Sequence, residues 1–193
     1  MEPIYLEKNI FYYENFLTTE MLNWLKSEIN DDRPWQGIGS GYENVEVDTE
    51  NSWFKNVKAL KDENMQKVLR KKLDDIMPTH GLIGERTFQY PRSIMRYPTG
   101  NMMGEHFDGD PNFPGINKIK WAGVMYINDD FEGGEIEYPN FNIKLKPKPG
   151  MLIVHHGGKD YLHKVNTITS GTRYMMNTFV SDDIVNGPGV EYF

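Results

Sequence analysis

The first third of the chain carries apolar positions at helical spacing. One such segment follows Thr18 and Thr19, either of which can cap a helix, and a second runs over about residues 62–76. The inward positions are Leu22, Leu25 and Ile29 in the first segment and Met65, Leu69, Leu73 and Ile76 in the second. Pro78 ends the second segment, because proline cannot continue a helix. Two helices are therefore expected here.

From residue 82 onward the pattern changes to short strand-like segments separated by turn residues. Residues 121–127 are apolar on both faces, which is typical of a central strand that is covered on both sides. Helices followed by about eight short antiparallel strands predict a mainly β fold with flanking helices. We expect a double-stranded β-helix, or jelly roll, with an N-terminal helical layer. The expected strands lie near residues 86–97, 121–128, 134–138, 141–146, 151–155, 162–168 and 173–180.

The length of 193 residues and the absence of repeats or linkers predict a single domain over residues 1–193. Within it we expect a helical and loop cover over residues 1–81, a jelly-roll catalytic core over residues 82–181 and a C-terminal tail over residues 182–193. Residues 31–56 and 109–120 are rich in glycine and aromatic residues, and we expect these two loops to face a substrate.

The composition limits the kinds of metal site and the kinds of partner that the chain can have. The chain has no cysteine, which excludes disulfides, iron–sulfur clusters and zinc fingers and leaves His, Asp and Glu as metal ligands. The net charge of −7 disfavours a nucleic-acid partner. The alternating lysines at 144, 146 and 148 are interpreted as a solvated strand face. Residues 1–10 lack a signal-peptide pattern and no stretch has membrane-spanning length, so we expect a soluble, cytoplasmic protein without a membrane partner.

Three residues carry the candidate metal chemistry: His106, Asp108 and His163. In a strand, residues i and i+2 point to the same face, so His106 and Asp108 can grip one ion together. Two histidines and one carboxylate form the facial triad of mononuclear non-haem iron(II) oxygenases, which leaves coordination positions open. Arg173 lies ten residues after His163 and supplies a cation with a rigid fork of donors.

These residues resemble the HxD…H…R/K pattern of the 2-oxoglutarate- and Fe(II)-dependent dioxygenases. Over about residues 90–180 the chain is most similar to their prolyl 4-hydroxylase-like branch. The blocks that carry the resemblance are Arg96-Tyr97-Pro98-Thr99-Gly100, His106-Phe107-Asp108, Phe131-Glu132-Gly133-Gly134-Glu135, Pro147-Lys148-Pro149-Gly150, Leu162-His163-Lys164-Val165 and Ser170-Gly171-Thr172-Arg173. The first 80 residues match no such motif.

The resemblance implies a hydroxylase that converts 2-oxoglutarate and O2 to succinate and CO2 while hydroxylating an unactivated C–H. It implies that His106, Asp108 and His163 hold Fe(II), that Arg173 binds the far carboxylate of 2-oxoglutarate, and that Tyr97 is a second donor to it. Ascorbate is a candidate reductant. The implied substrate is a peptidyl proline or another amino-acid residue, in a peptide, a protein or a free amino acid. If the chain turns at residues 169–171, Arg173 pairs near Asn166, about 10 Å along the strand from His163.

Alternatives remain at this point. His155 and His156 are a rival metal pair, although a strand end with one side chain exposed is the simpler interpretation. A cupin-like metal-binding module without oxygenase activity would leave Arg173 unexplained. An AlkB-like oxidative demethylase would carry a second arginine where this chain has Phe179. Collagen-type hydroxylases use lysine at the position of Arg173, so proline is only the family default, and the substrate and oligomeric state stay open.

Overall fold

The computed structural model describes residues 1–35, 56–78, 87–112 and 118–181, with only the backbone described at 87–89. This part of the chain forms two α-helices, short 3-10 turns and thirteen strands. The helices are α1 (Thr19–Asn30) and α2 (Glu63–Asp74). The strands are β1 (Ile4–Glu7), β2 (Ile10–Tyr13), β3 (Val57–Ala59), β4 (Thr87–Gln89), β5 (Ser93–Pro98), β6 (Met103–His106), β7 (Ile119–Tyr126), β8 (Phe131–Gly133), β9 (Ile136–Tyr138), β10 (Ile143–Leu145), β11 (Leu152–His156), β12 (His163–Val165) and β13 (Ile168–Ser181).

Both expected helices are present, and each begins at a capping side chain. The hydroxyl oxygen of Thr18 accepts a hydrogen bond from the Met21 amide at 3.3 Å. The Asp62 carboxylate accepts from the amides of Asn64 and Met65 at 3.0 and 3.1 Å. These caps satisfy amides that have no partner within the helix. Within the described residues, neither helix has the length and apolar character needed to cross a bilayer.

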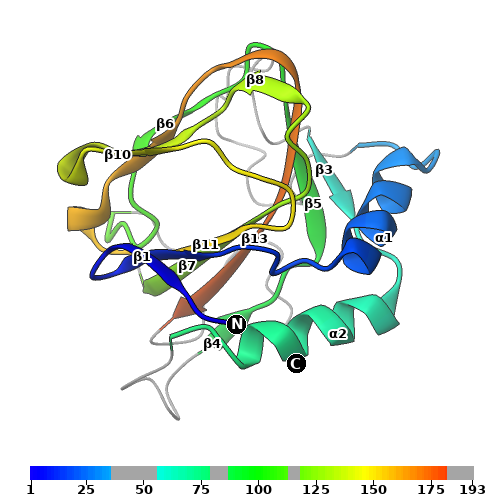
Figure 1. The fold of residues 1–193 in the computed structure, drawn as a ribbon, viewed down its shortest axis with the longest axis horizontal. Coiled ribbons are helices and arrows are strands. Elements are labelled where there is room, and N and C mark those ends of the chain that lie inside the picture. Colours follow the sequence, from blue (N-terminus) through cyan, green and yellow to red (C-terminus); the bar gives the residue numbers. More distant parts are fainter. Residues whose placement is uncertain (36–55, 79–86, 113–117, 182–193) are drawn as a thin grey trace.

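The strands form two sheets that face each other, which confirms the expected jelly roll. The large sheet has the order β1-β2-β11-β7-β13-β5-β3, with β4 and β8 also pairing with β13. The small sheet has the order β10-β9-β12-β6. Figure 1 shows α1 and α2 on the outer side of the large sheet, with the small sheet on its other side. The large sheet therefore has two buried faces.

Strand β11 shows how the two faces divide the core. Leu152 and Val154 belong to the apolar cluster that includes residues of α1 and α2. Ile153 belongs to a second cluster, which lies between the two sheets. Because side chains alternate along a strand, His155 points to the same side as Ile153. The same alternation explains why residues 121–127 are apolar on both faces.

The N-terminal segment contributes more than a helical and loop cover. Strands β1, β2 and β3 lie within residues 1–81, and β2 pairs with β11 in the large sheet. These strands are only three or four residues long, so they show no periodicity by which the sequence can reveal them. The segment expected as one strand over residues 86–97 is two strands that both pair with β13, and Pro91, which has no amide hydrogen to donate, lies between them.

Replacing Leu73 with alanine is expected to lower the free energy of unfolding by about 2–5 kcal/mol, because the side chain is fully buried in the helix-side cluster. The matched control is Val68→Ala on the same helix, where the side chain is 49% exposed and the change should stay within about 0.5 kcal/mol. Denaturant unfolding of both variants tests this. Equal effects in the two variants would contradict the assignment of this face to the core.

Candidate functional site

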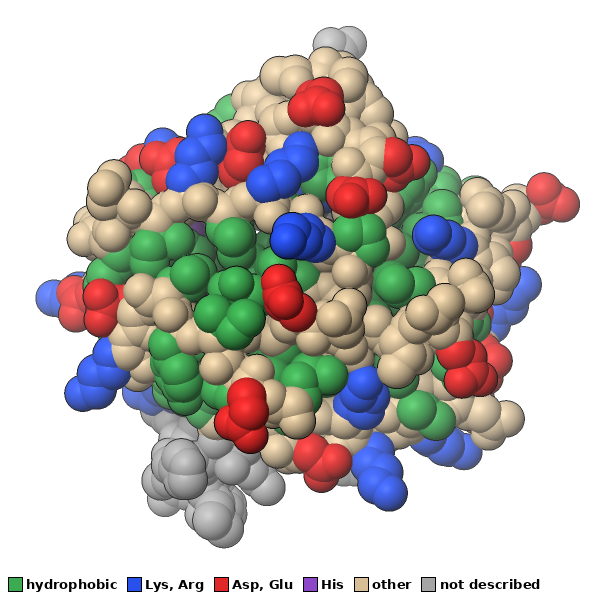
Figure 2. All heavy atoms as spheres, viewed as in Figure 1, with side chains coloured by type: hydrophobic (Ala, Val, Ile, Leu, Met, Phe, Trp, Pro, Cys, Tyr) green, Lys and Arg blue, Asp and Glu red, His purple; other side chains and the backbone are tan. Residues whose placement is uncertain are grey.

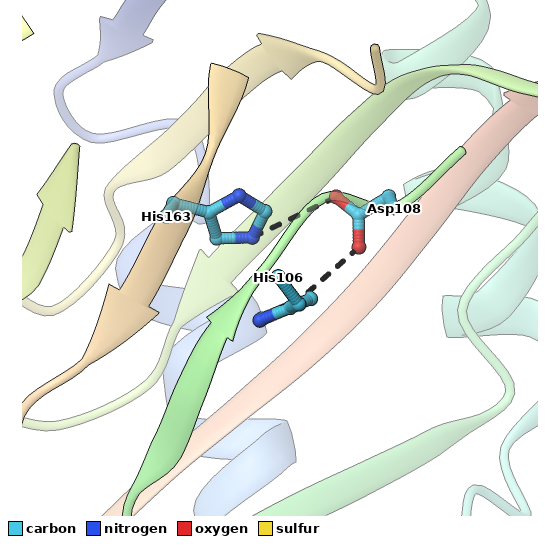
Figure 3. Close-up of side chains that lie close together, drawn as sticks. All are labelled: His106, Asp108 and His163. Carbon is cyan, nitrogen blue, oxygen red and sulfur yellow. Dashed lines mark ion pairs between the residues drawn. The ribbon is translucent and has the colours of Figure 1, made fainter. Parts of the chain in front are cut away.

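The small sheet brings His106, Asp108 and His163 together. His106 ends β6 and His163 begins β12, and the two residues are directly paired across the strands. Asp108 lies two residues beyond His106. One ligand atom from each of the three residues lies within 4.8 Å of the others. Figure 3 shows the two imidazoles and the carboxylate converging from the paired strands and the loop after β6.

Both histidines are oriented by the same local contact. Nδ1 of His106 lies 2.8 Å from the carbonyl oxygen of Gly104, and Nδ1 of His163 lies 3.0 Å from the carbonyl oxygen of Tyr161. When Nδ1 donates to a carbonyl, the lone pair of the imidazole is on Nε2, which is the arrangement usual for metal-binding histidines. The Nε2 atoms of both rings face Asp108, at 3.9 Å from Oδ1 and 3.8 Å from Oδ2.

The electrostatics favour the metal-binding forms of these groups. Burial and the neighbouring His155 lower the pKa of His163 to about 3, although the charge of Asp108 opposes this shift. Burial raises the pKa of Asp108, but the contact with His155 and the nearby imidazoles outweigh burial and hold this pKa well below its usual value. At neutral pH the site therefore offers a neutral imidazole and an ionised carboxylate, the forms that bind a divalent cation.

A buried arginine, Arg173, lies on β13 of the large sheet, and its charge and that of Asp108 both act on Tyr97. Arg173 is only 1% exposed, and its Nε and Nη1 atoms have no hydrogen-bond partner in the described part of the chain. No carboxylate among the described residues forms an ion pair with it. Its guanidinium carbon lies 5.1 Å from the ring centre of Tyr97 and 5.0 Å from that of Tyr126. A buried cation without a counter-ion is costly, so this environment favours an anionic ligand.

Two glycines allow the backbone to approach the arginine closely. Gly133 and Gly134 both have positive φ angles, of 74° and 67°. A Cβ atom on Gly134 would lie 2.4 Å from the Ile168 side chain and 3.3 Å from Cδ of Arg173. Lys146 holds this loop, because its ammonium donates to the carbonyls of residues 131 and 133 at 2.8 and 2.9 Å. Lys146 is therefore a structural residue rather than part of a purely solvated strand face.

A family model for the 2OG-Fe(II) oxygenase superfamily matches residues 93–181, the part of the chain that contains all of these groups. This region resembles that superfamily in sequence. The match supports the enzyme class inferred from the motifs, and the donor set of the three residues suits a divalent metal such as Fe(II).

Solved structures show that the fold of this chain is shared with prolyl hydroxylases. The viral collagen prolyl hydroxylase of Paramecium Bursaria Chlorella virus-1 superimposes with a TM-score of 0.61 at 20% identity, covering 92% of this chain and 97% of the viral protein. A prolyl hydroxylase of Trichoplax adhaerens, solved with a hypoxia inducible factor peptide, gives a TM-score of 0.66 at 20% identity, covering 90% and 84%.

Curated relatives match shorter segments of this chain. Prolyl 3-hydroxylase 2 of Homo sapiens is 36% identical over 58 residues, which cover 28% of this chain and 8% of the human protein. A PKHD-type hydroxylase of Psychrobacter is 31% identical over 100 residues, covering 47% of this chain and 37% of the relative. The chain thus spans only a small part of the first relative and little more than a third of the second.

Arg173 is positioned by a different strand pairing from that of the expected hairpin. The prediction that Arg173 pairs near Asn166 is wrong, because β12 and β13 lie in different sheets. Arg173 pairs instead with Tyr97 of β5. Burial raises the pKa of Tyr97, while the charge of Arg173 opposes this shift and that of Asp108 adds to it. Tyr97 therefore lies within electrostatic reach of both the arginine and the triad.

Sequence reasoning missed Tyr126 and the contact of His155 with Asp108. The hydroxyl of Tyr126, at the end of β7, is fully buried beside Arg173 and has no hydrogen-bond partner in the described part of the chain. His155 and His156 lie at the end of β11, as expected, and His155 is completely buried, 3.2 Å from Asp108. His156 is the partly exposed member of that pair and packs against Trp121. Tyr126 and His155 differ from ordinary core residues only in that their side chains lie on the face of the large sheet that points toward the small sheet.

The Tyr126→Phe substitution is expected to raise the Kd for 2-oxoglutarate by about 10-fold. The variant loses one hydroxyl donor to a charged carboxylate, worth about 1.5 kcal/mol, without changing the ring. Calorimetric titration of the Mn(II)-loaded protein with 2-oxoglutarate measures the effect. Tyr13→Phe, in the helix-side cluster, is the matched control and should leave the Kd unchanged. An unchanged Kd in Tyr126→Phe would exclude Tyr126 from the cosubstrate site.

Proposed function

We propose that this chain is an Fe(II)- and 2-oxoglutarate-dependent dioxygenase that hydroxylates an unactivated C–H of a peptidyl proline or another amino-acid residue. The observation that carries the proposal is the buried Arg173, which has no carboxylate partner among the described residues, together with the His106–Asp108–His163 cluster. A metal site alone fits many proteins. A metal site together with a buried arginine that lacks a carboxylate partner in the described part of the chain fits a ligand that carries an anionic end.

The residues fit the absent metal and cosubstrate. Two imidazoles with Nε2 facing an ionised carboxylate form a donor set suited to Fe(II). Arg173 would bind the far carboxylate of 2-oxoglutarate through its planar fork. The ring centres of Tyr126 and Tyr97 lie 5.0 and 5.1 Å from the guanidinium carbon, and their hydroxyls would add donors.

When bound, Fe(II), 2-oxoglutarate and O2 supply the oxidising chemistry: 2-oxoglutarate becomes succinate and CO2, with one oxygen atom of O2 entering succinate and the other entering the substrate as a hydroxyl. The chain contributes orientation and exclusion of water. The interior between the sheets is lined by aromatic and aliphatic side chains, including Tyr138, which packs against His163 with ring centres 5.6 Å apart. This lining keeps the cosubstrate away from bulk solvent and from stray reductants.

The substrate class rests on the relatives. Prolyl 3-hydroxylase 2 and the Trichoplax prolyl hydroxylase, which is solved with a peptide, favour a peptide substrate. Of the loops expected to face it, 31–56 lies largely outside the described residues and 109–120 lies partly outside them. Ascorbate remains a candidate reductant that would keep the iron in its ferrous state.

The alternatives explain fewer observations. A cupin-like metal-binding module without oxygenase activity does not account for the buried Arg173 or its two tyrosines. For an AlkB-like demethylase, Phe179 stands where a second arginine is expected. Figure 2 shows basic and acidic side chains interspersed over the visible face, where no single-sign basic patch marks a nucleic-acid surface.

The test is 2-oxoglutarate turnover with peptides. The protein is incubated with Fe(II), 2-oxoglutarate, ascorbate and a library of proline-containing peptides, and each peptide is paired with an alanine version. We expect succinate release that depends on Fe(II), and a peptide that gains one oxygen atom only when proline is present. If no peptide changed the rate of succinate release, a peptide substrate would be excluded. If no succinate were released at all, the proposed dioxygenase activity would be wrong.

A further inference from the structure

One buried polar side chain next to the metal cluster has no part in the proposal above. His155 in β11 is fully buried, and neither of its ring nitrogens has a hydrogen-bond partner of normal geometry in the described part of the chain. Its Nε2 atom nevertheless lies 3.2 Å from Oδ2 of Asp108. Leaving a buried imidazole without a hydrogen bond is destabilising, so the presence of His155 here points to a hydrogen bond that forms in the metal-bound site.

The fold brings His155 and Asp108 together by a backbone connection. The amide of Gly109, directly after Asp108, donates to the carbonyl of Gly157 at 2.8 Å. Gly157 follows β11 by one residue, so this bond ties the loop after β6 to the end of β11. A Cβ atom on Gly109 would lie 2.4 Å from the Ile119 carbonyl oxygen, which leaves no room for a larger residue. The approach of His155 to Asp108 is thus fixed by the backbone.

Of the three imidazoles around Asp108, that of His155 lies nearest to the carboxylate. The 3.2 Å from His155 Nε2 to Asp108 is shorter than the 3.8 Å from His163 Nε2 or the 3.9 Å from His106 Nε2. Rings on either side restrict how His155 can turn, because the ring centres of His163 and Tyr138 lie 4.3 and 5.4 Å away.

The tautomer of His155 should differ from that of the two ligand histidines. In His106 and His163 a carbonyl next to Nδ1 holds the proton there and leaves Nε2 as the metal donor. Among the described residues, no carbonyl is hydrogen-bonded to Nδ1 of His155. The carboxylate beside Nε2 instead favours the tautomer with the proton on Nε2, which makes His155 a hydrogen-bond donor to Asp108 and not a ligand.

We propose that His155 is a positioning residue, which donates from Nε2 to Asp108 and holds this carboxylate in the orientation that faces His106 and His163. The inference rests on the proposed function, since it assigns a purpose within the same metal site. Ligating carboxylates are commonly oriented by such a hydrogen bond, and losing an outer partner costs about 10–100-fold in metal affinity.

The experiment compares Mn(II) affinity in the wild type, His155→Phe and His155→Gln, measured on the full chain by the electron paramagnetic resonance signal of free Mn(II). We expect His155→Phe, which keeps a ring but removes the donor, to raise the Mn(II) Kd by about 10–100-fold. His155→Gln keeps an N–H near the position of Nε2 and should recover most of the affinity. The neighbouring His156→Gln is the matched control and should bind Mn(II) like the wild type.

A stability measurement separates positioning from a purely structural effect. Without metal, the free energy of unfolding of His155→Phe should stay within about 1.5 kcal/mol of the wild-type value, because the apolar ring fills the same buried site and only one hydrogen bond to Asp108 is lost. A lower midpoint that accounts for the affinity loss would overturn the proposal. Unchanged Mn(II) affinity in His155→Phe would also overturn the proposal. If His155→Phe lost as much Mn(II) affinity as His106→Ala and glutamine did not restore it, His155 would be a ligand instead. If the wild type itself binds no Mn(II), the proposed function fails instead.

Discussion

Replacing Arg173 with alanine is expected to raise the Kd for 2-oxoglutarate by about 100- to 1000-fold while Mn(II) affinity changes little. The guanidinium is buried and has no other anionic partner among the described residues, so the full charge-assisted interaction should go to the cosubstrate. Losing one partner of a buried ion pair costs about 3–5 kcal/mol, and each 1.4 kcal/mol corresponds to a factor of ten. Calorimetric titration of the Mn(II)-loaded variant gives the Kd.

The Arg173→Lys variant is the matched control for charge. Lysine keeps the positive charge but loses the planar fork, so we expect an intermediate Kd for 2-oxoglutarate. If Arg173→Ala binds 2-oxoglutarate as tightly as the wild type, the arginine does not bind the cosubstrate and the buried cation needs another explanation.

The His106→Ala substitution is expected to raise the Mn(II) Kd by more than about 100-fold and to abolish 2-oxoglutarate turnover. Because outer-shell partners alone are worth about 10–100-fold, the loss of a direct ligand should exceed that range. The His106 side chain is 35% exposed, so its removal leaves little cavity and the fold should be retained.

Glu105→Ala, one residue earlier in β6, controls for the disturbance of the strand. The Glu105 side chain is 50% exposed and its ion pair with Lys164, at 3.5 Å, is a surface contact of little energetic value. This variant should bind Mn(II) like the wild type. Equal affinities in His106→Ala and the wild type would remove His106 from the ligand set.

The sequence predicts the candidate ligands well for a local reason. His106 and Asp108 are two residues apart, so any strand-like backbone places their side chains on one side. His163 joins them because β12 pairs with β6, which is a long-range contact that only the family resemblance could supply. The structure brings the three side chains together, and their binding of iron remains the proposal that the variants above test.

The residues that the sequence did not reveal share a different property. Tyr126 and His155 are ordinary-looking members of apolar strands, and their importance follows only from which face of the large sheet points to the small sheet. The expected hairpin for Arg173 was wrong for the same reason. Spacing along the chain cannot show that β12 and β13 separate into two sheets.

The short N-terminal strands illustrate another limit. Residues 10–13 are four apolar or aromatic residues in a row, which a sequence pattern cannot assign to a strand or a helix. Their strand conformation comes from pairing with β11, more than a hundred residues later. The helices, in contrast, were predictable because twelve residues and a capping side chain carry a local signal.

The most direct measurement is an anaerobic titration of the metal-free protein with Fe(II) and then with 2-oxoglutarate, followed by visible absorption. We expect a weak charge-transfer band that appears only when both are present, at one equivalent of each, and that disappears on exposure to O2 with release of succinate. Binding of iron without any band on addition of 2-oxoglutarate would contradict the account, because the site would then be a metal centre with no place for the cosubstrate.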